Sequence, residues 1–352
     1  MKRIAILGGS RFIGCHLVKA LQRKEYKITI FNRGITSPPE PFHEGITHVT
    51  GNRNNHEDLQ KVFCKYFDVV FDLSGYTVHH VEPIITHYHH SFGQYIFCST
   101  SSVYKLPISC PLNENSPIDF QKNTYGGDKA LVEELLLKEY SNKQLPITIF
   151  RPQGVFGPYD AHQAGFIVFR LINSFPVVVN PEKNFKINFL YIKDLIKAFL
   201  LAMDNPNAYG KVYGIAGDDI ISQLHFIKMC GDIVSRKPIL KFSDCSFHFG
   251  QKIDVPWLEY DIITDNNKIK KELDLNFTPL YIALSKTIAW LVNNPQHTGS
   301  RLLRGELHFI EDRRISKFVR IYWKVIDKLE LKRRLRNNKL VLFLLAVKKC
   351  IY

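Results

Sequence analysis

Residues 3–14 read RIAILGGSRFIG, a short apolar run followed by a glycine-rich turn. After the turn, apolar side chains recur at Ile13, Leu17 and Leu21, which is the spacing of a helix with one buried face. A glycine-rich turn between a first strand and a first helix is suited to bind pyrophosphate, because the helix N-terminus offers free N–H groups and glycine lets the phosphate come close. This stretch therefore predicts a dinucleotide-binding fold that starts at residue 3.

The residues of this turn have separate expected roles. Gly8 would make the tight turn and Gly14 would let the helix pack closely on the strand, whereas Arg11 stands where a third glycine is expected. The predicted cofactor-binding residues of the turn are Gly8, Gly9, Ser10, Arg11, Phe12, Ile13 and Gly14.

Strand-like and helix-like segments alternate through the first 150 residues. Candidate strands lie at 3–7, 27–31, 46–49, 68–73, 94–99 and 147–150, and candidate helices at 12–24, 56–64, 80–89 and 125–139. This alternation predicts an α/β fold, a Rossmann-type doubly wound parallel sheet, with a dinucleotide-binding domain at 1–150. Beyond Arg151, helical pieces separated by Pro- and Asn-bearing loops predict a smaller, interleaved C-terminal substrate lobe at 151–297, with segments that return to the Rossmann core.

The end of the second candidate strand bears on the choice of cofactor. It reads TIFNRG and carries Asn32 and Arg33 where an NAD site usually places a carboxylate for the ribose 2′-hydroxyl. Guanidinium groups hydrogen-bond a 2′-phosphate in a forked geometry, so Arg11 and Arg33 favour NADP, with NAD as the alternative. A competing interpretation is that Arg11 packs over the adenine or pairs with a surface carboxylate.

A second group of residues indicates a catalytic site. In NTYGGDK, Tyr125 and Lys129 are four residues apart and so share one face of a helix. A nearby ammonium favours the phenolate, so we expect Lys129 to lower the pKa of Tyr125 toward the working range and to hold the nicotinamide ribose. The hydroxyl run after the fifth candidate strand offers Thr100 as a third catalytic residue.

These motifs together resemble the extended short-chain dehydrogenase/reductases of the NAD-dependent epimerase/dehydratase family. The similarity covers residues 1–295 and rests on GGSRFIG, STSSVY, YGGDK, RPQGVFGPYD and FLYIKDLIKAFLLA, in the family's order. It is greatest with a GGxRFIG branch that includes chloroplast stem-loop-binding proteins. The resemblance implies a 3-2-1-4-5-6-7 sheet, hydride exchange through a bound nicotinamide, and Thr100, Tyr125 and Lys129 as catalytic residues. It places Pro152 near the carboxamide, and Asn52, Leu73 and Lys129 complete the predicted cofactor-binding set.

Departures from the family pattern narrow the expected reaction. The 4,6-dehydratases carry acidic residues after the catalytic threonine, whereas this chain has Ser101 and Ser102, whose hydroxyls cannot serve as general acid and base at neutral pH. The family's sugar-nucleotide epimerases carry an asparagine where this chain has Gly154, and an arginine where it has Ile187. We therefore predict an NAD(P)-dependent oxidoreductase or epimerase acting on a hydroxyl/carbonyl carbon of a sugar or nucleotide-sugar-like metabolite, and not a 4,6-dehydratase. The alternative is a non-catalytic dinucleotide-binding scaffold that binds RNA or a membrane surface.

Charge is concentrated at the C-terminus. Residues 299–352 carry +10 of the net charge of +14, and 298–352 is predicted as a basic amphipathic helical tail. Three interpretations stay open: packing onto the body or a homodimer partner, peripheral contact with a membrane surface, and, ranked last, contact with RNA.

Other patterns suggest a cytoplasmic protein without a metal. The chain has no apolar run of 18 residues, no secretory signal pattern, and seven dispersed cysteines without a CxxC pair. The histidines of 78–90 lack the i, i+4 spacing of zinc ligands on a helix, so no metal site is expected.

Overall fold

The structure is a computed structural model that describes residues 1–42, 44–105, 109–160, 163–175, 177–179, 184–242, 247–248, 251–252 and 260–294. Those up to 242 and from 260 to 294 belong to one compact unit, and those of a short hairpin, β14 (Phe247–His248) with β15 (Gln251–Lys252), belong to a second. The predicted tail at 298–352, and every interpretation of it, lies outside the described residues. The division at residue 150 stays a prediction.

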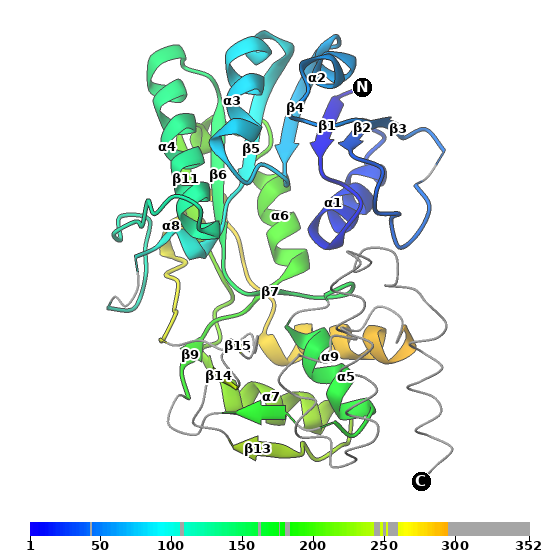
Figure 1. Cartoon of the computed structure of the whole chain (residues 1–352), viewed down its shortest axis with the longest axis vertical. Coiled ribbons are helices and arrows are strands. Elements are labelled where there is room, and N and C mark those ends of the chain that lie inside the picture. Colours follow the sequence, from blue (N-terminus) through cyan, green and yellow to red (C-terminus); the bar gives the residue numbers. More distant parts are fainter. Residues whose placement is uncertain are drawn as a thin grey trace. The chain divides into compact units, whose positions relative to one another are not determined.

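The first unit is built on a parallel seven-stranded sheet (Figure 1). Its order is β11-β6-β5-β4-β1-β2-β3, which is the 3-2-1-4-5-6-7 order that the family resemblance implied. The strands are β1 (Arg3–Leu7), β2 (Lys27–Asn32), β3 (Thr47–Thr50), β4 (Phe67–Asp72), β5 (Phe92–Cys98), β6 (Ile147–Pro152) and β11 (Lys211–Ile215). The predicted Rossmann-type fold is confirmed. The seventh strand, β11, was not among the strands predicted from the residues themselves.

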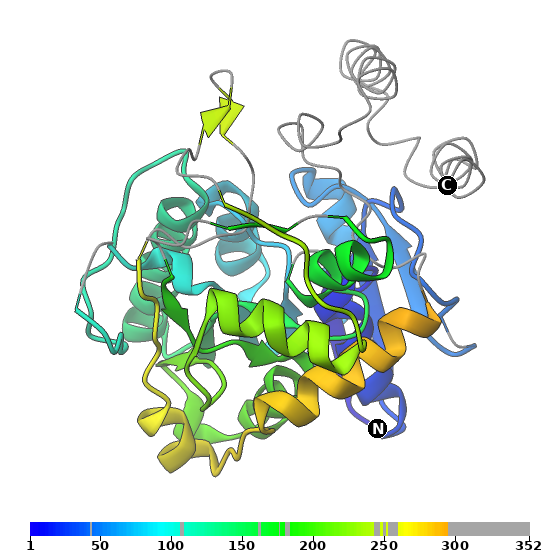
Figure 2. The ribbon, with the colours of Figure 1, turned by 90° about the horizontal axis from the view of Figure 1, so that it is seen from below.

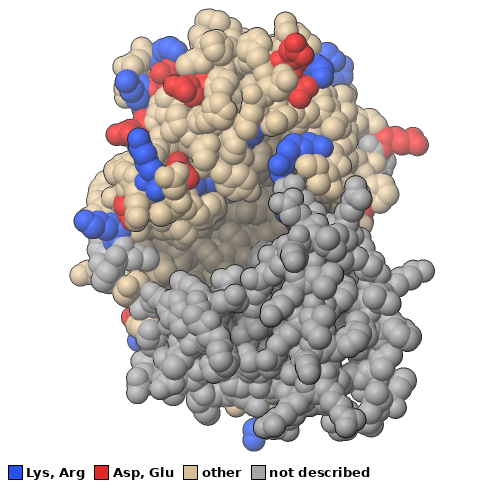
Figure 3. Space-filling view, in the orientation of Figure 1, with Lys and Arg blue, Asp and Glu red and all other residues tan. Residues whose placement is uncertain are grey.

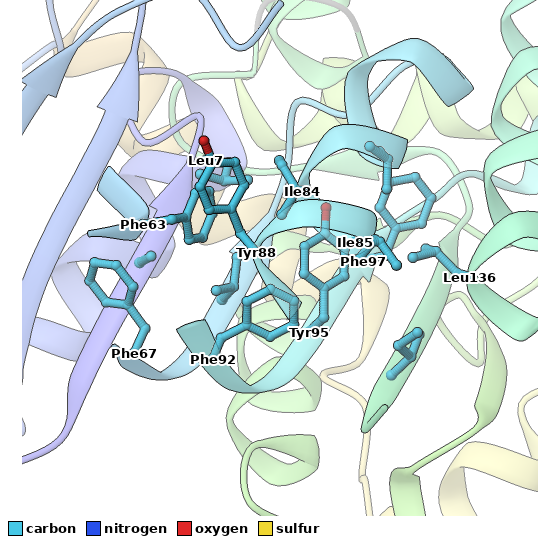
Figure 4. Close-up of a cluster of buried hydrophobic side chains, with 14 of the residues drawn as sticks. Leu7, Phe63, Phe67, Ile84, Ile85, Tyr88, Phe92, Tyr95, Phe97 and Leu136 are labelled. Atoms are coloured by element: carbon cyan, nitrogen blue, oxygen red, sulfur yellow. The ribbon is translucent and has the colours of Figure 1, made fainter. Parts of the chain in front are cut away.

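Helices cover both faces of this sheet. On one face, α2 (His56–Phe63), α3 (Val78–His87) and α4 (Tyr125–Lys143) bury a cluster of apolar side chains against the strands. Figure 4 shows Phe63, Tyr88 and Phe92 grouped with Tyr95 and Phe97 in this cluster. On the other face lie α1 (Phe12–Gln22), α6 (Ile192–Ala202) and α8 (Asn267–Leu273). Alternate residues of each strand therefore enter two separate cores, which explains the continuous apolar runs in the sequence.

The remaining helices pack together below the sheet. Figure 2 shows α5 (Ala164–Ile172), α7 (Gln223–Ile233) and α9 (Leu280–Asn293) beside one another. Three two-stranded sheets also belong to this unit: β7 (Val155–Phe156) with β10 (Leu190–Tyr191), β9 (Lys186–Ile187) with β12 (Ile221–Ser222), and β8 (Val177–Val179) with β13 (Leu240–Phe242). Single 3₁₀ turns occur at η1 (His89–Ser91), η2 (Ser101–Val103) and η3 (Pro206–Ala208). None of the helices in the described ranges is long and apolar enough to cross a membrane.

Candidate active site

The predicted site residues gather at one edge of the sheet. Because all seven strands are parallel, their carboxyl ends meet at the same edge. The glycine turn follows β1, and the other predicted cofactor and catalytic residues end or follow the next strands: Asn32 and Arg33 at β2, Asn52 at β3, Leu73 at β4, Thr100 at β5 and Pro152 at β6. In the space-filling view the described surface is hollowed below this edge (Figure 3).

The turn between β1 and α1 is too tight for side chains at its glycines. Gly8 has a φ of +113°, in the left-handed region that favours glycine. A Cβ at Gly14 would lie 2.7 Å from the Cα of Gly9, and a Cβ at Gly9 would lie 2.9 Å from the Ile30 side chain. Gly14 therefore lets the helix pack directly on the backbone of the turn, and Gly9 lets the turn lie close against the Ile30 side chain of β2.

The N-terminus of α1 has the chemistry of an anion site. Its N-cap, Arg11, is extended and its side chain makes no capping hydrogen bond, and the first turn contains no acidic residue. The free N–H groups and the positive end of the helix dipole are thus available to an anion. Together with the close glycine packing, this fits the pyrophosphate of a dinucleotide.

Asn32 joins the glycine turn to the end of β2. Its Nδ2 donates to Oγ of Ser10 at 2.8 Å, and its Oδ1 accepts from the N–H of Gly34 at 2.8 Å. Both neighbouring arginines, Arg11 and Arg33, are exposed, and within the described ranges neither forms an ion pair. This geometry leaves the two guanidinium groups available where the adenosine ribose would lie.

His48 is a further polar residue of this corner that the sequence did not indicate. It lies on β3, is exposed, and its Nε2 is 3.1 Å from Oδ1 of Asn32. In the pairing of β2 with β3, His48 lies opposite Ile30, two residues before Asn32. The contact between His48 and Asn32 could therefore be found only from the register of the sheet.

The start of α4 lies against the hydroxyl run that follows β5. Thr100 caps η2 by accepting the N–H of Ser102 at 3.1 Å, and its Oγ1 lies 3.2 Å from Oγ of Ser102. A Cβ at Gly126 would lie 1.9 Å from the carbonyl oxygen of Ser102, so only glycine allows this approach. Gly126 therefore lets the start of α4 lie directly against η2, with Tyr125 beside Thr100.

Tyr125 is accessible, with 54% of its surface exposed. Partial burial raises the pKa of Tyr125 to about 12, with smaller contributions from Cys98 and Tyr76, and a hydrogen bond with Thr100 opposes this rise. The direction is opposite to the lowering expected from Lys129. Tyr125 is therefore a protonated phenol at neutral pH and a weaker acid than a tyrosine in water.

Lys129 lies one helical turn after Tyr125 and is only 1% exposed. Its Nζ donates to the carbonyl oxygen of Cys98 at 2.6 Å, and burial lowers the pKa of Lys129. No carboxylate among the described residues pairs with it. The ammonium therefore lies directly beneath the end of β5, next to the residue that precedes the hydroxyl run.

An ion pair that the sequence did not predict supports the loop after β4. Arg53 donates to both carboxylate oxygens of Asp72, at 2.9 and 2.7 Å, and to Oγ of Ser74 at 3.0 Å. Asp72 also accepts the N–H groups of Ser74 and Gly75 and the hydroxyl of Tyr95. Despite its burial, its pKa is lowered to about 2 by the Arg53 guanidinium and by the bonds from Tyr95 and the Ser74 N–H. The only sequence signal is a charged residue at the end of the apolar run DVVFD.

A second buried ion pair lies under the hydroxyl run. Arg151, at the end of β6, donates to both carboxylate oxygens of Glu133 on α4, with distances of 3.0 and 2.6 Å to Oε2. Both side chains are 2% exposed, and Ser99 also donates to Glu133. The pair thus fixes α4 to two strand ends next to the candidate catalytic residues.

Comparisons with known proteins agree with this geometry. The sequence pattern of the NAD dependent epimerase/dehydratase family matches residues 4–94 and 84–216. The chain is 28% identical over 287 residues to the chloroplast stem-loop binding protein of 41 kDa b of Arabidopsis thaliana, covering 77% of this chain and 74% of that protein. It is 25% identical over 294 residues to a UDP-glucose 4-epimerase of Yersinia enterocolitica, covering 67% and 86%.

Solved structures share the fold. A dTDP-glucose 4,6-dehydratase of Bacillus anthracis in complex with NAD superposes with a TM-score of 0.73 at 18% identity, covering 84% of this chain and 98% of that chain. A UDP-glucuronic acid 4-epimerase of Bacillus cereus, in complex with UDP-glucuronic acid and NAD, gives 0.67 at 21% identity, covering 83% and 99%. From the family match over more than half of its length, this chain belongs to the NAD dependent epimerase/dehydratase family.

Proposed function

We propose that the protein is an NAD(P)-dependent oxidoreductase or epimerase that acts on a hydroxyl/carbonyl carbon of a sugar or nucleotide-sugar-like metabolite. The observation that carries this proposal is the position of Tyr125. Its phenol is half exposed, hydrogen-bonded with Thr100, and one helical turn from Lys129, at the carboxyl edge that also holds the glycine turn. A scaffold without catalysis would have no need of an accessible phenol at this place.

The residues have distinct roles in the proposed reaction. When bound, a nicotinamide dinucleotide supplies or accepts the hydride and, in its oxidised form, brings a positive ring charge. Tyr125 gives its proton to the substrate oxygen as a carbonyl is reduced, and takes it back as an alcohol is oxidised. Thr100 holds the same oxygen by a hydrogen bond. Lys129, one helical turn from Tyr125, supplies a positive charge at the end of β5 and donors for the ribose hydroxyls.

The raised pKa of Tyr125 leaves the phenol protonated at neutral pH, as the donor in carbonyl reduction must be, but makes it a weaker acid than an ordinary tyrosine. For the oxidation direction, the positive charges of Lys129 and of an oxidised nicotinamide would have to stabilise the phenolate. A released NADPH would therefore favour net reduction, and a retained NAD would favour epimerisation.

The exposed Arg11 and Arg33, without a carboxylate at Asn32, support NADP as the cofactor. NAD remains the alternative, because the dehydratase and epimerase structures with the same fold are NAD complexes. The experiment is to denature the purified protein and identify any released dinucleotide, and to titrate the dinucleotide-free protein with NADPH and NADH.

The serines beside Thr100 disfavour a 4,6-dehydratase, although dehydratases occur among the relatives. Ser102 is exposed and its hydroxyl is engaged with Thr100, and neither it nor Ser101 can exchange protons as a carboxylate can. At the position of the epimerases' arginine, Ile187 is 5% exposed and packed in β9. A sugar diphosphate would therefore need another cation, such as the exposed Lys186.

Turnover of UDP-glucose and UDP-galactose, and NADPH-dependent reduction of keto sugars, would test the reaction. Tyr125→Phe should lower the turnover by roughly 100-fold or more, as loss of a general acid does. Tyr281→Phe, which alters an exposed tyrosine on α9, is the control. Biological function undiminished in Tyr125→Phe would instead favour the scaffold.

A further inference from the structure

The ammonium of Lys129 is enclosed by three groups. Besides the hydrogen bond to the carbonyl oxygen of Cys98, its Nζ lies 4.5 Å from the ring centroid of Phe97 and 5.2 Å from that of Tyr76. An ammonium has three donors, and here one is used while the other two sides face aromatic rings. Lys129 is consequently 1% exposed. In this arrangement its remaining donors are covered.

Of the three groups, only Tyr76 lies on a loop and is exposed, and its ring contacts that of His80 edge-on, with centroids 6.3 Å apart. Phe97 and Cys98 belong to β5 and are buried, at 0% and 6% exposure. Tyr76 belongs to the loop between β4 and α3 and is 48% exposed, with its ring centroid 6.3 Å from that of Tyr125. The ring of Tyr76 therefore lies between solvent and the lysine, beside the candidate catalytic phenol.

The backbone that carries Tyr76 is well anchored. Asp72 accepts the N–H groups of Ser74 and Gly75 at 3.0 and 2.8 Å, and the N–H of Tyr76 donates to Nδ1 of His80 at 3.2 Å. Because the main chain is held on both sides while the side chain is half exposed, the ring can turn about its own side-chain bonds without moving the loop. Such a rotation would uncover the ammonium.

We propose, as a consequence of the function proposed above, that Tyr76 is a further residue of the dinucleotide site. Its ring covers the Lys129 ammonium in the free protein and rotates away when a dinucleotide binds, so that the ribose hydroxyls contact the ammonium instead. The cation–π contact with Tyr76 is then exchanged for hydrogen bonds to the ribose. Tyr76 competes with the dinucleotide for Lys129, so removing its ring should strengthen binding.

The test compares Tyr76→Ala, which removes the ring, with Tyr76→Phe, which keeps it. Tyr66→Ala is the matched control, because Tyr66 is also a half-exposed tyrosine, at 42%, with a cation, Arg3, over its ring, but precedes the other end of β4. NADPH and NADH are titrated against each protein by fluorescence. From the usual strength of a cation–π contact, Tyr76→Ala should bind roughly 2- to 5-fold more tightly, and the other two variants should bind as the wild type does.

A second measurement requires no cofactor. Lysines of the free protein are acetylated with a small amine reagent and quantified by mass spectrometry. Lys129 should be protected in the wild type, in Tyr76→Phe and in Tyr66→Ala, and labelled in Tyr76→Ala.

The proposal is overturned if Tyr76→Ala binds the dinucleotides no more tightly than the wild type does. It is also overturned if Lys129 stays protected from acetylation in Tyr76→Ala. A wild-type protein that binds neither dinucleotide is a different failure. That result overturns the proposed function itself, whereas the labelling still shows whether Tyr76 covers Lys129.

Discussion

The side chain of Asn32 donates a hydrogen bond from Nδ2 to Oγ of Ser10 at 2.8 Å, and so ties the end of β2 to the glycine turn. In the sequence, Arg33 directly follows Asn32, and Arg11 directly follows Ser10. The bond therefore holds the two arginine-bearing segments next to each other. Specificity for a 2′-phosphate is expected to depend on this contact as well as on the guanidinium groups.

Arg11→Ala and Arg33→Ala should each weaken NADPH binding by roughly 10-fold, because each removes a charge-assisted hydrogen bond to the phosphate. NADH binding should change little, since NADH lacks that phosphate. Asn32→Asp should favour NADH, because a carboxylate there repels the 2′-phosphate and accepts from the 2′-hydroxyl. Fluorescence titration measures all three, with Arg23→Ala, at the end of α1, as the control. Equal affinities of the wild type for the two cofactors would refute the NADP assignment.

Gly126→Ala should disrupt the active site although it adds a single methyl group. The new Cβ would lie 1.9 Å from the carbonyl oxygen of Ser102, so the start of α4 has to move away from η2 and carry Tyr125 away from Thr100. We expect a lower melting temperature and a greater loss in kcat than in dinucleotide affinity. Glu134→Ala, on the exposed side of the same helix, should affect neither. A Gly126→Ala protein with wild-type kcat would contradict the proposed role of this contact.

Most of the sheet could be predicted from the sequence, because strands buried on both faces are continuous apolar runs. The predicted runs at 3–7, 27–31 and 147–150 fall within β1, β2 and β6. β11 reads KVYGI, and its lysine, glycine and tyrosine weaken the apolar pattern. It follows β6 by nearly sixty residues, so only the family's sheet order indicated that a seventh strand exists.

Local motifs are enough to name residues of the candidate site, whereas contacts between distant segments cannot be predicted from them. The glycine turn, Tyr125, Lys129 and Thr100 could all be named in advance from local patterns. The contacts of Lys129 with Tyr76 and of Arg53 with Asp72 depend on strand ends meeting in space. The predicted lowering of the Tyr125 pKa was wrong, because burial raises this pKa and the ammonium of Lys129 is bonded to the carbonyl oxygen of Cys98 instead.

Removing one partner of the Glu133–Arg151 pair should destabilise the fold strongly. In Glu133→Gln, the Arg151 guanidinium stays buried without its counter-charge, which typically costs about 3–5 kcal/mol in the free energy of unfolding. Lys143→Ala breaks an i,i+4 pair on the same helix whose lysine is exposed to solvent, although the side chain of Glu139 is only 12% exposed, and should cost less, about 1 kcal/mol or below. Urea denaturation measures both. A loss of less than about 1 kcal/mol in Glu133→Gln would mean that the pair is not the main anchor of α4.

The buried Asp72 should make stability fall at acidic pH. Its pKa is lowered from the ordinary 3.8 to about 2 in the folded protein, so the unfolded chain binds a proton more readily. The stabilisation is therefore fully present above pH 4, about 2 kcal/mol in all, and is lost as the pH falls toward 2, with about half gone by pH 3. Asp72→Asn lacks this titration and should be less stable than the wild type at pH 5. Urea denaturation at pH 5 and pH 3 should show the difference between the two proteins narrowing by about 1 kcal/mol. A difference that stays constant or widens would show that Asp72 is not held as a carboxylate by Arg53, and the anchoring of the Tyr76 loop through Asp72 would then need another explanation.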